Sequence, residues 1–504
     1  MVAKRNNVSF EDALTMTGYG KFNLLMFTVC SSVITGMVFE VFSVSYLVPA
    51  SACELNTTST QQGIMAGIPL TGVIMTSHIW GYLADTRGRR KILSICMSIG
   101  FIAGSIAAFS PDWISFSVFK FTSSAALGGA FALSMTLLSE CTLAAKRSSL
   151  VILTTTVFMF SSGLMALISI PVLPLKFSYY ISILDIHFNS WRLLSLIFSA
   201  PSAACAIAVA CTYESPKYLV SVRKEEEALK TLRGIFMINS GKSGSLYQVD
   251  SVILDEKLTE NTKGIFRSML AQTLPLLQPP LLKRTLLIGL LFAMSYIALN
   301  PFMVWLPFIV NSFISPSGGN ETKLTLCQMA QLFMDTTKTV QKPSDCTMNK
   351  FAMLVVFGMN TILSIFNMFL SSLVSWAGRK RVFIGLQIIA GLSGLCVNLS
   401  SIKWLSAIFF VIFLLAILNF GLLTTYSVDI FPTYVRAMAV CLTLMVGRGS
   451  AVIGINVLKI LIESHCEVAF YIFGGVTICS GLIGVLIPSD AQLLKLKQED
   501  SGKP

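Results

Sequence analysis

Residues 81–91 read GYLADTRGRRK, and residues 371–381 read SSLVSWAGRKR. Both segments carry the pattern Gly-Arg-basic-basic directly after a long apolar stretch, and the two copies lie 290 residues apart. An acidic and a basic residue spaced by seven also recur, at an offset of 289 residues: Glu140 with Arg147, and Asp429 with Arg436. Two repeats at nearly one offset predict an internal duplication, with two halves that share one fold.

Apolar windows of membrane-spanning length surround these repeats. The chain has 504 residues, of which 54% are hydrophobic and 12% charged, whereas a soluble domain has about 25% charged residues. A bilayer core needs roughly 20 apolar residues per helix, and twelve windows of about that length occur: 22–48, 63–84, 92–110, 113–138, 149–174, 191–213, 285–313, 351–376, 382–401, 403–428, 437–462 and 468–487. Because an open strand edge would leave backbone amides unpaired in lipid, the sequence predicts an all-α membrane protein with twelve transmembrane helices in two pseudo-symmetric six-helix bundles.

The connections between the windows define the remaining segments. We expect a cytosolic N-terminal segment (1–21), two six-helix bundles (22–213 and 284–487), a cytosolic central loop (214–283), an outer loop (315–349) and a cytosolic tail (488–504). Lys and Arg are more frequent in the connections on the side of the termini, which the positive-inside rule assigns to the cytosol. The net charge of +12 arises in loops that face anionic lipid, so nucleic acid is not an expected partner.

The predicted outer connections contain four cysteines: Cys53, Cys327, Cys346 and Cys466. Four cysteines allow three pairings. Cys327 with Cys346 is the disulfide candidate, because both lie in one connection of an oxidising compartment. Asn320 begins an Asn-Glu-Thr sequon in the same loop, and Asn56 begins a second sequon closer to the membrane. Both asparagines are candidate glycosylation sites.

The segment 81–91 resembles the signature between the second and third spans of the major facilitator superfamily, Gly-x-x-x-Asp-x-x-Gly-Arg-basic-basic. Gly81 would allow close helix contact, and Gly88 would permit a tight turn. Asp85 at a helix C-terminus should seek a basic partner such as Arg89. The resemblance implies a latch that closes the inner side of a transporter in one state, with Glu140 and Arg147 as charged partners. An ordinary solvated basic turn is the alternative.

The complete set of candidate gate residues covers both copies of the repeat. Its members are Gly81, Asp85, Gly88, Arg89, Arg90, Lys91, Glu140, Arg147, Gly378, Arg379, Asp429 and Arg436.

Longer strings over most of the chain resemble the synaptic vesicle glycoprotein 2 group and its organic-ion transporter relatives. They are EVFSVSYLVPA (40–50), HFNSWRLL (187–194), YESPKYL (213–219), LLQPPLLKRTLL (276–287) and YSVDIFPTYVR (426–436). The resemblance implies the major facilitator fold, with a substrate site near the midplane between two halves. It also implies either transport or a role in membrane trafficking.

Three ionisable residues inside the spans are functional candidates, because a charge at the bilayer centre costs about 2.5 to 3.5 kcal/mol on insertion scales. Glu40 could attract a cationic substrate or carry a proton, or it could form an ion pair that braces the first half. Lys120 could relay a proton, which Arg cannot do, or it could neutralise Glu40. Arg448 could approach the cavity or could serve packing.

Amides and aromatics of the seventh and eighth spans form the predicted cavity set: Tyr296, Asn300, Trp305, Asn360 and Asn367. Asn360 and Asn367 are seven residues apart and therefore share one helix face, although hydrogen bonds between helices would also explain them. The sequence contains no recognisable nucleophile, metal-ligand cluster or cofactor motif. We therefore expect neither an enzyme nor a bound metal or cofactor.

Together these features predict a secondary-active or facilitative transporter of a small organic solute, such as an organic ion, that works by alternating access. A proton or another cation is the candidate coupling ion. We expect a monomer in the plasma membrane or an intracellular vesicle membrane. The alternative is a non-transporting synaptic vesicle glycoprotein 2-like protein that acts in membrane trafficking or as an interaction partner.

Overall fold

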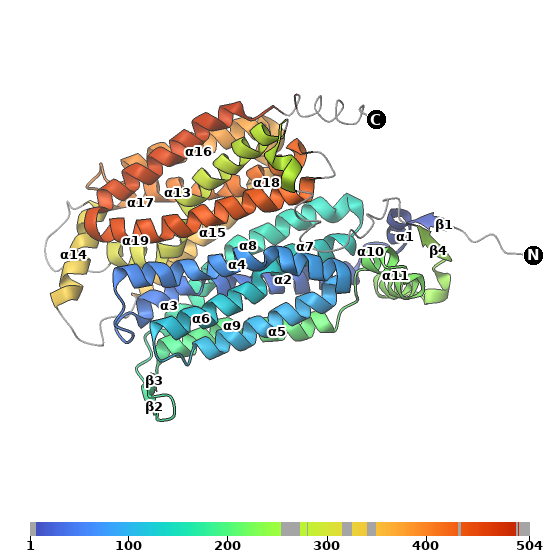
Figure 1. The fold of residues 1–504 in the computed structure, drawn as a ribbon, viewed down its shortest axis with the longest axis horizontal. Helices are drawn as coiled ribbons and strands as arrows, with labels where there is room; N and C mark the ends of the chain where they lie inside the picture. The colour runs from blue at the N-terminus through green and yellow to red at the C-terminus, as the bar shows by residue number, and fades with distance from the viewer. Residues whose placement is uncertain are drawn as a thin grey trace, which may run out of the picture.

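A computed structural model of the chain describes residues 7–253, 273–279, 281–314, 325–339, 349–431, 435–489 and 492. Its long helices form two bundles that lie side by side along one axis (Figure 1). The first bundle contains α2 (Lys21–Phe42), α3 (Val44–Ser51), α4 (Ser59–Arg87), α5 (Arg89–Ala107), α6 (Trp113–Ala126), α7 (Ala130–Glu140), α8 (Ala144–Val172) and α9 (Ser190–Ala210). The second contains α13 (Leu282–Ile314), α15 (Lys350–Ala377), α16 (Arg379–Cys396), α17 (Lys403–Leu414), α18 (Asn419–Ile430) and α19 (Arg436–Ile483), with α14 (Leu326–Thr339) beside it.

The number of spans agrees with the twelve predicted once two features are considered. Ten helical segments among the described residues are long and apolar enough to cross a membrane. One of them, α19, has 48 residues with a break at His465, so it consists of two arms. The helix α16 has 18 residues, three of them basic at its start, and it is not among the ten. With α16 and the second arm of α19, each bundle has six spans.

The internal duplication is visible in the backbone as well as in the sequence. Gly88 separates α4 from α5 with φ 103° and ψ 141°, and Gly378 separates α15 from α16 with φ 83° and ψ 145°. Residues with a side chain rarely adopt such positive φ values, so glycine suits both turns. The fourth and tenth spans are also both interrupted by a 3-10 turn, at η1 (Leu127–Gly129) and η4 (Leu415–Leu418).

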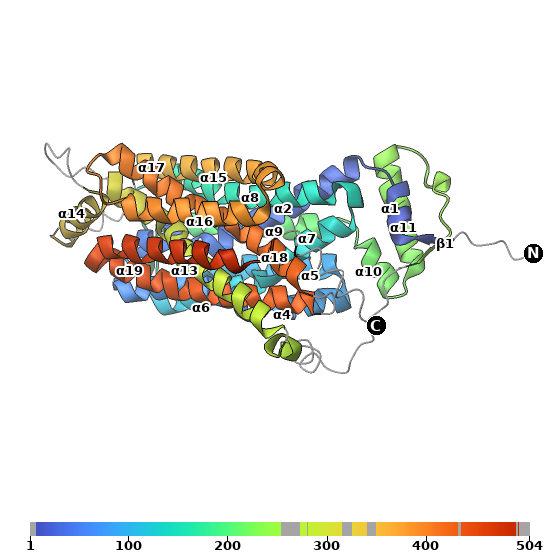
Figure 2. The ribbon, with the colours of Figure 1, turned by 90° about the horizontal axis from the view of Figure 1, so that it is seen from above.

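A small domain of short elements lies beyond one end of the first bundle (Figures 1 and 2). It combines β1 (Asn7–Ser9) and α1 (Phe10–Met16) from the N-terminal segment with elements that follow α9, namely α10 (Pro216–Ser221), α11 (Glu225–Ser240), η2 (Gly244–Leu246) and β4 (Ser251–Ile253). The strands β1 and β4 pair in parallel. Phe10 and Leu14 pack with Leu232, Tyr247 and Val252 in its core. We call this unit the connector domain. A separate short turn, η3 (Leu274–Leu277), precedes α13.

The two ends of the molecule differ, and we name them by their turns. The turn end carries Gly88, Gly378 and the connector domain. The hairpin end carries the antiparallel pair of β2 (Tyr179–Ile181) and β3 (Ile186–Phe188), together with α14. Figure 1 shows the hairpin and the connector domain at opposite ends of the first bundle.

 The first arm of α19 runs towards the hairpin end and its second arm returns from the break at His465. The short η5 (Gly484–Leu486) that follows α19 therefore lies at the turn end, beside Phe383 of α16.

The halves meet mainly along two helix pairs, α4 with α19 and α8 with α15, and α3 also contacts α13. Near the hairpin end the packing is close: a Cβ atom on Gly63 would lie 2.8 Å from Asn456 Oδ1, and one on Gly163 would lie 3.1 Å from Asn360 Cβ. Towards the turn end, no described side chain of residues 365–377 is buried, and Ala84 is the only buried residue of 74–87. The halves therefore pack more tightly at the hairpin end.

The structure overturns the predicted disulfide. Cys327 of α14 is bonded to Cys466, at the break of α19, with 5.5 Å between the Cα atoms. The pairing of Cys327 with Cys346 is therefore wrong; Cys346 itself lies outside the described residues, as does Asn320. The two bonded residues are 139 positions apart in the chain, and the folding of α14 against α19 brings them together. Cys53 is also disulfide-bonded, and Asn56 is exposed with a φ of 47°.

Candidate functional site

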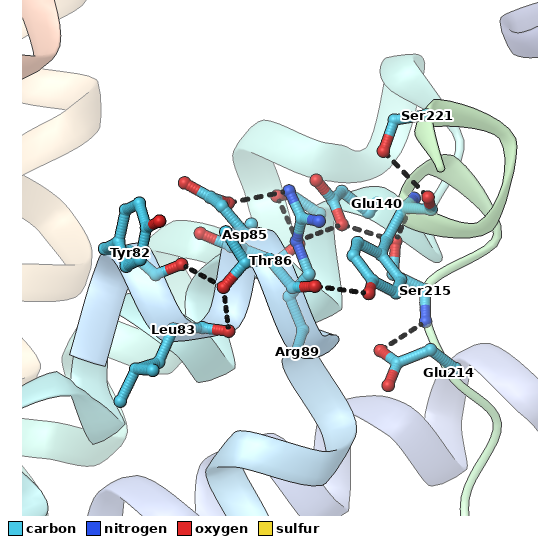
Figure 3. Close-up of polar contacts among 12 residues, drawn as sticks. Tyr82, Leu83, Asp85, Thr86, Arg89, Glu140, Glu214, Ser215 and Ser221 are labelled. Carbon is cyan, nitrogen blue, oxygen red and sulfur yellow. Dashed lines mark hydrogen bonds and ion pairs between the residues drawn. The ribbon is translucent and has the colours of Figure 1, made fainter. Parts of the chain in front are cut away.

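Arg89 is the centre of a polar cluster at the turn end of the first bundle (Figure 3). The Gly88 turn places it at the first residue of α5. Its guanidinium lies 3.1 Å from Asp85 and 3.2 Å from Glu140, which ends α7. Asp85 is largely exposed, whereas the side chains of Arg89 and Glu140 are mostly buried. The Arg89–Glu140 pair, shielded from water, is therefore the stronger of the two contacts.

The connector domain completes this cluster. Ser215 donates a hydrogen bond to Glu140, and Glu214 accepts hydrogen bonds from the backbone amides of Arg90 (2.9 Å) and Ser215 (3.0 Å). The ring of Tyr218 lies 5.2 Å from the guanidinium of Arg89. Burial raises the pKa of Tyr218, so its hydroxyl stays protonated and donates to the carbonyl of Thr86.

The second bundle repeats the arrangement with its own residues. Arg379, the first residue of α16, forms an ion pair with Asp429 near the end of α18, and its guanidinium lies 5.3 Å from the ring of Tyr426. Ser375 occupies the place of Asp85. Arg436 begins α19, and its side chain is outside the described part of the structure.

Two predicted gate residues, Gly81 and Arg147, have surroundings that differ from those expected. A Cβ atom on Gly81 would meet nothing within 4 Å, so the predicted close helix contact at Gly81 is wrong. Arg147, implied to be a charged partner of the latch, pairs instead with Glu11 of α1 at 3.2 Å and donates to the carbonyl of Ser139. No local pattern indicates this contact, because Glu11 lies in the N-terminal segment, 136 positions from Arg147. Lys91 is exposed.

Glu40 and Lys120 form a buried ion pair inside the first bundle. Lys120 Nζ lies 2.9 Å from Glu40 Oε2, and both side chains are fully buried. Ser123 donates to the same carboxylate oxygen at 3.1 Å. A Cβ atom on Gly104 of α5 would clash with Glu40 Oε1, so the carboxylate occupies the space that this glycine leaves. Of the two alternatives for Glu40, the geometry matches the brace between α2, α5 and α6.

Arg448 lies between the two bundles. It is on α19, is half-buried, and donates to the hydroxyl of Ser77 on α4 at 3.4 Å. His78, also on α4, and Tyr296 on α13 are within its electrostatic reach. Tyr296 is the one member of the predicted cavity set that adjoins Arg448, and its ring packs against Phe420.

The other members of the predicted cavity set are dispersed. Asn367 on α15 donates to Thr156 of α8 at 3.3 Å, across the interface between the halves. Asn360 is buried and donates to the carbonyl of Val356 in its own helix. Asn300 is half-buried on α13. Trp305 is fully buried near the hairpin end and donates to the carbonyl of Ile455.

A polar cluster at the hairpin end was not predicted. Lys459 of α19 is 2% exposed, and its Nζ lies 2.8 Å from Glu463. The same ammonium lies 4.8 Å from the ring centre of Trp305 and 4.1 Å from that of Phe308. Ser59, the first residue of α4, donates a hydrogen bond to Glu463 across the interface. The Lys-x-x-x-Glu spacing was the available signal, since it places both charges on one helix face.

A second unpredicted contact braces the hairpin end of the first bundle. Arg192 is fully buried and lies 2.7 Å from Glu54, and it donates to the carbonyls of Ala108 and Ser110. Trp191 donates to Glu54 as well, at 2.7 Å. The string HFNSWRLL therefore contains residues that hold the ends of spans together.

Known proteins resemble this chain in sequence over most of its length. The svop-1 protein of Caenorhabditis elegans is 22% identical over 496 residues, which cover 96% of this chain and 85% of that protein. Human synaptic vesicle glycoprotein 2B is 24% identical over 60% of this chain, but the match spans only 47% of that protein. The organic cation/carnitine transporter 7 of Arabidopsis thaliana is 24% identical over 56% of this chain and 58% of that protein.

Solved structures show the same fold. The inward-open xylose transporter of E. coli superimposes with a TM-score of 0.67 at 16% identity, covering 95% of this chain and 99% of that one. The nucleoside transporter NupG gives a TM-score of 0.61 at 12% identity, over 93% of this chain and all of the other. The family model described as Major Facilitator Superfamily matches residues 28–455. This chain therefore belongs to the Major Facilitator Superfamily, a family of membrane transporters and not of enzymes.

Proposed function

We propose that the protein moves a small organic anion across the membrane by alternating access, driven by the gradient of the solute or of a coupled proton or cation. The proposed preference for an anion rests on one observation, the lack of a carboxylate partner for Arg448 among the described ion pairs. The lysines 120 and 459 have carboxylate partners, whereas none of the ion pairs among the described residues involves Arg448. A half-buried guanidinium between two moving halves suits a carboxylate or phosphate, which it can bind through two hydrogen bonds.

Neighbouring groups would give this site its selectivity. Ser77, His78 and Tyr296 surround Arg448 with hydroxyl and imidazole groups, which can donate to further solute oxygens. They come from both halves, α4 on one side and α13 on the other, so a bound solute would contact both. Such a site can respond to the relative movement of the halves.

The difference between the two ends supports alternating access. Ser59 and Glu463 bond across the interface at the hairpin end, while the turn-end segments 74–87 and 365–377 are largely without buried side chains. Transport would require these contacts to open as the turn end closes. The ion pairs of Arg89 and Arg379 lie within their own halves, so we assign them to holding each turn rigid during this movement.

We infer that the turn end faces the cytosol. The basic residues of both Gly-Arg turns lie there, as the positive-inside rule requires. The disulfide-bonded residues Cys53, Cys327 and Cys466 lie at the hairpin end, which suits an oxidising lumen or exterior. A plasma membrane and a vesicle membrane both agree with this orientation.

Uptake into proteoliposomes tests the proposal. Wild-type protein should take up members of an anionic metabolite pool more than members of a cationic pool. Arg448→Met should reduce that uptake to the level of empty liposomes, and Arg448→Lys should retain part of it. Arg381→Met, which removes an exposed charge at the turn end, is the matched control and should leave uptake unchanged. Uptake of cations alone, or uptake that Arg448→Met leaves intact, would refute the anionic site.

A role in membrane trafficking is the second candidate. Its support is the set of matches to synaptic vesicle glycoproteins 2B and 2C. Under this alternative, no protein-dependent uptake would be measured for either pool, even when the reconstituted protein is folded and correctly oriented.

A further inference from the structure

The β2–β3 hairpin has two unlike faces. Its cross-strand pairs are Tyr179 with Phe188, Tyr180 with His187, and Ile181 with Ile186. Because successive residues of a strand point to opposite faces, Tyr179, Phe188, Ile181 and Ile186 form one face, which is apolar. The protein covers the β3 side of this face, since Ile186 is buried and Phe188 half-buried, and leaves Tyr179 exposed. The other face holds Tyr180 and His187, and its polar groups bond locally, Tyr180 to Asp185 at 2.8 Å and His187 to Ser178 at 3.0 Å.

Apolar side chains are also unusually exposed around this hairpin. Ile183, in its turn, is 92% exposed, the highest value of any large hydrophobic residue in the described part of the chain. Tyr179 is 70% exposed and Leu184 is 42% exposed. If this loop faced water, polar residues at these positions would cost no stability. The exposed apolar residues therefore indicate a surface that contacts a partner.

The position of the hairpin identifies that partner. Figure 1 shows that it extends sideways from the hairpin end of the first bundle, across the direction of the long helices. A helix bundle that spans a membrane is surrounded there by the lipid headgroups and the first carbons of the acyl chains. Tyrosine is enriched at this level, because its ring is apolar and its hydroxyl is polar.

The apolar face continues the lipid-facing surface of the bundle. On α5, a stripe of exposed isoleucines at helical spacing leads to the hairpin end: Ile95, Ile99, Ile102 and Ile106. Beyond it, Phe109 stacks on Phe188 with ring centres 5.9 Å apart. Phe188 in turn contacts Phe177, which contacts Tyr179. The aromatic row therefore runs without interruption from the side of α5 onto the hairpin.

We infer that the β2–β3 hairpin is a membrane-surface anchor, which inserts Tyr179, on the exposed side of its apolar face, and the Ile183 turn into the leaflet at the hairpin end. The exposed Lys176 precedes β2 and can reach lipid phosphates from the same position. The anchor would fix the level of the first bundle in the bilayer while the second bundle moves against it. The inference depends on the membrane fold alone and holds whichever solute is carried.

Site-directed fluorescence in proteoliposomes tests the anchor. The full chain carries Cys211→Ser and Cys479→Ser, which remove the two exposed free cysteines among the described residues, and an environment-sensitive dye is attached through Ile183→Cys. Phosphatidylcholine with a spin label near the headgroup should quench this dye at least threefold more than aqueous iodide does. A dye at Lys242→Cys, on the exposed surface of the connector domain, should show the reverse preference.

Two further measurements separate the anchor from other outcomes. A dye at Tyr179→Cys should be quenched by lipid more strongly than one at His187→Cys, since these residues lie on opposite faces. Diluting the protein tenfold in lipid should not change the ratio of lipid quenching to iodide quenching at Ile183→Cys. If a second copy of the chain covered the hairpin instead of lipid, dilution would separate the copies and iodide quenching would rise, which would contradict the anchor. Iodide quenching at Ile183→Cys equal to that at Lys242→Cys, at any dilution, would overturn the inference.

Discussion

The Lys459–Glu463 pair predicts how the hairpin end responds to the loss of one charge. In Glu463→Gln the amide can still accept a hydrogen bond from Ser59, but Lys459, only 2% exposed, loses its counter-charge. Removing one partner of a buried ion pair costs about 3–5 kcal/mol. The rings of Trp305 and Phe308 lie over the ammonium with or without Glu463, so they do not change this cost.

This cost applies to the closed hairpin end alone, because opening gives Lys459 access to water. A difference of about 3 kcal/mol, the lower limit of this cost, changes the ratio of the two states by roughly 150-fold. The hairpin end should therefore be open far more often in Glu463→Gln than in the unmodified chain.

Cysteine accessibility measures this shift. Asn456 packs against Gly63 at the closed interface, so Asn456→Cys should react slowly with a membrane-impermeant thiol reagent added on the hairpin-end side. Glu463→Gln should accelerate the reaction at least fivefold. Glu467→Gln, an exposed acid four residues further along α19, is the matched control and should have no effect. Lys459→Met combined with Glu463→Gln should restore slow labelling, because no charge is left unpaired.

Equal labelling rates in Glu463→Gln and Glu467→Gln would refute this reasoning. That result would mean that the Lys459 charge is compensated without Glu463, or that the hairpin end does not open.

Three other substitutions test the fold. Gly88→Ala should lower the melting temperature in detergent, since a positive φ costs an alanine about 1–2 kcal/mol and its Cβ would lie 2.5 Å from Glu214; Gly81→Ala, with nothing within 4 Å, should not. Asn239→Ala should speed amide hydrogen exchange at the start of α2, because Asn239 accepts from the amide of Phe22 at 2.9 Å and donates to the carbonyl of Gly18 at 2.8 Å; unchanged exchange would show that the connector domain does not hold that segment. Cys327→Ser should lower the melting temperature, because a disulfide that closes so long a loop stabilises the folded state by about 4 kcal/mol or more. Peptide mapping of the unmodified chain should recover Cys327 joined to Cys466.

The duplicated architecture could be predicted because its signals are local. Apolar length identifies a span wherever it occurs, and a Gly-Arg turn needs only consecutive residues. Gly88 and Gly378 confirm this, since the two turns adopt nearly the same backbone angles. The twelve spans followed from the same kind of local information.

The contacts of the candidate sites depend on which helices pack against each other, and a single sequence does not show this. Arg147 pairs with Glu11 across 136 positions, and Arg192 reaches Glu54 across 138. Asn360 and Asn367 share a helix face as predicted, yet Asn360 bonds within its own helix while Asn367 reaches α8. Residue type and helical spacing indicated that these groups need partners, but the identity of each partner comes from the packing of helices remote in the chain.

The two Gly-Arg turns also differ in where they obtain their aromatic ring. Arg379 stacks on Tyr426 of α18, within its own bundle, whereas Arg89 stacks on Tyr218 of α10, after the last span of the first bundle. The halves are therefore unequal as separate pieces of protein. A chain cut after residue 253 would keep every partner of Arg89, and its two fragments should reassemble when produced together. A cut after residue 213 would transfer Glu214, Ser215 and Tyr218 to the other fragment and leave the first with an incomplete turn.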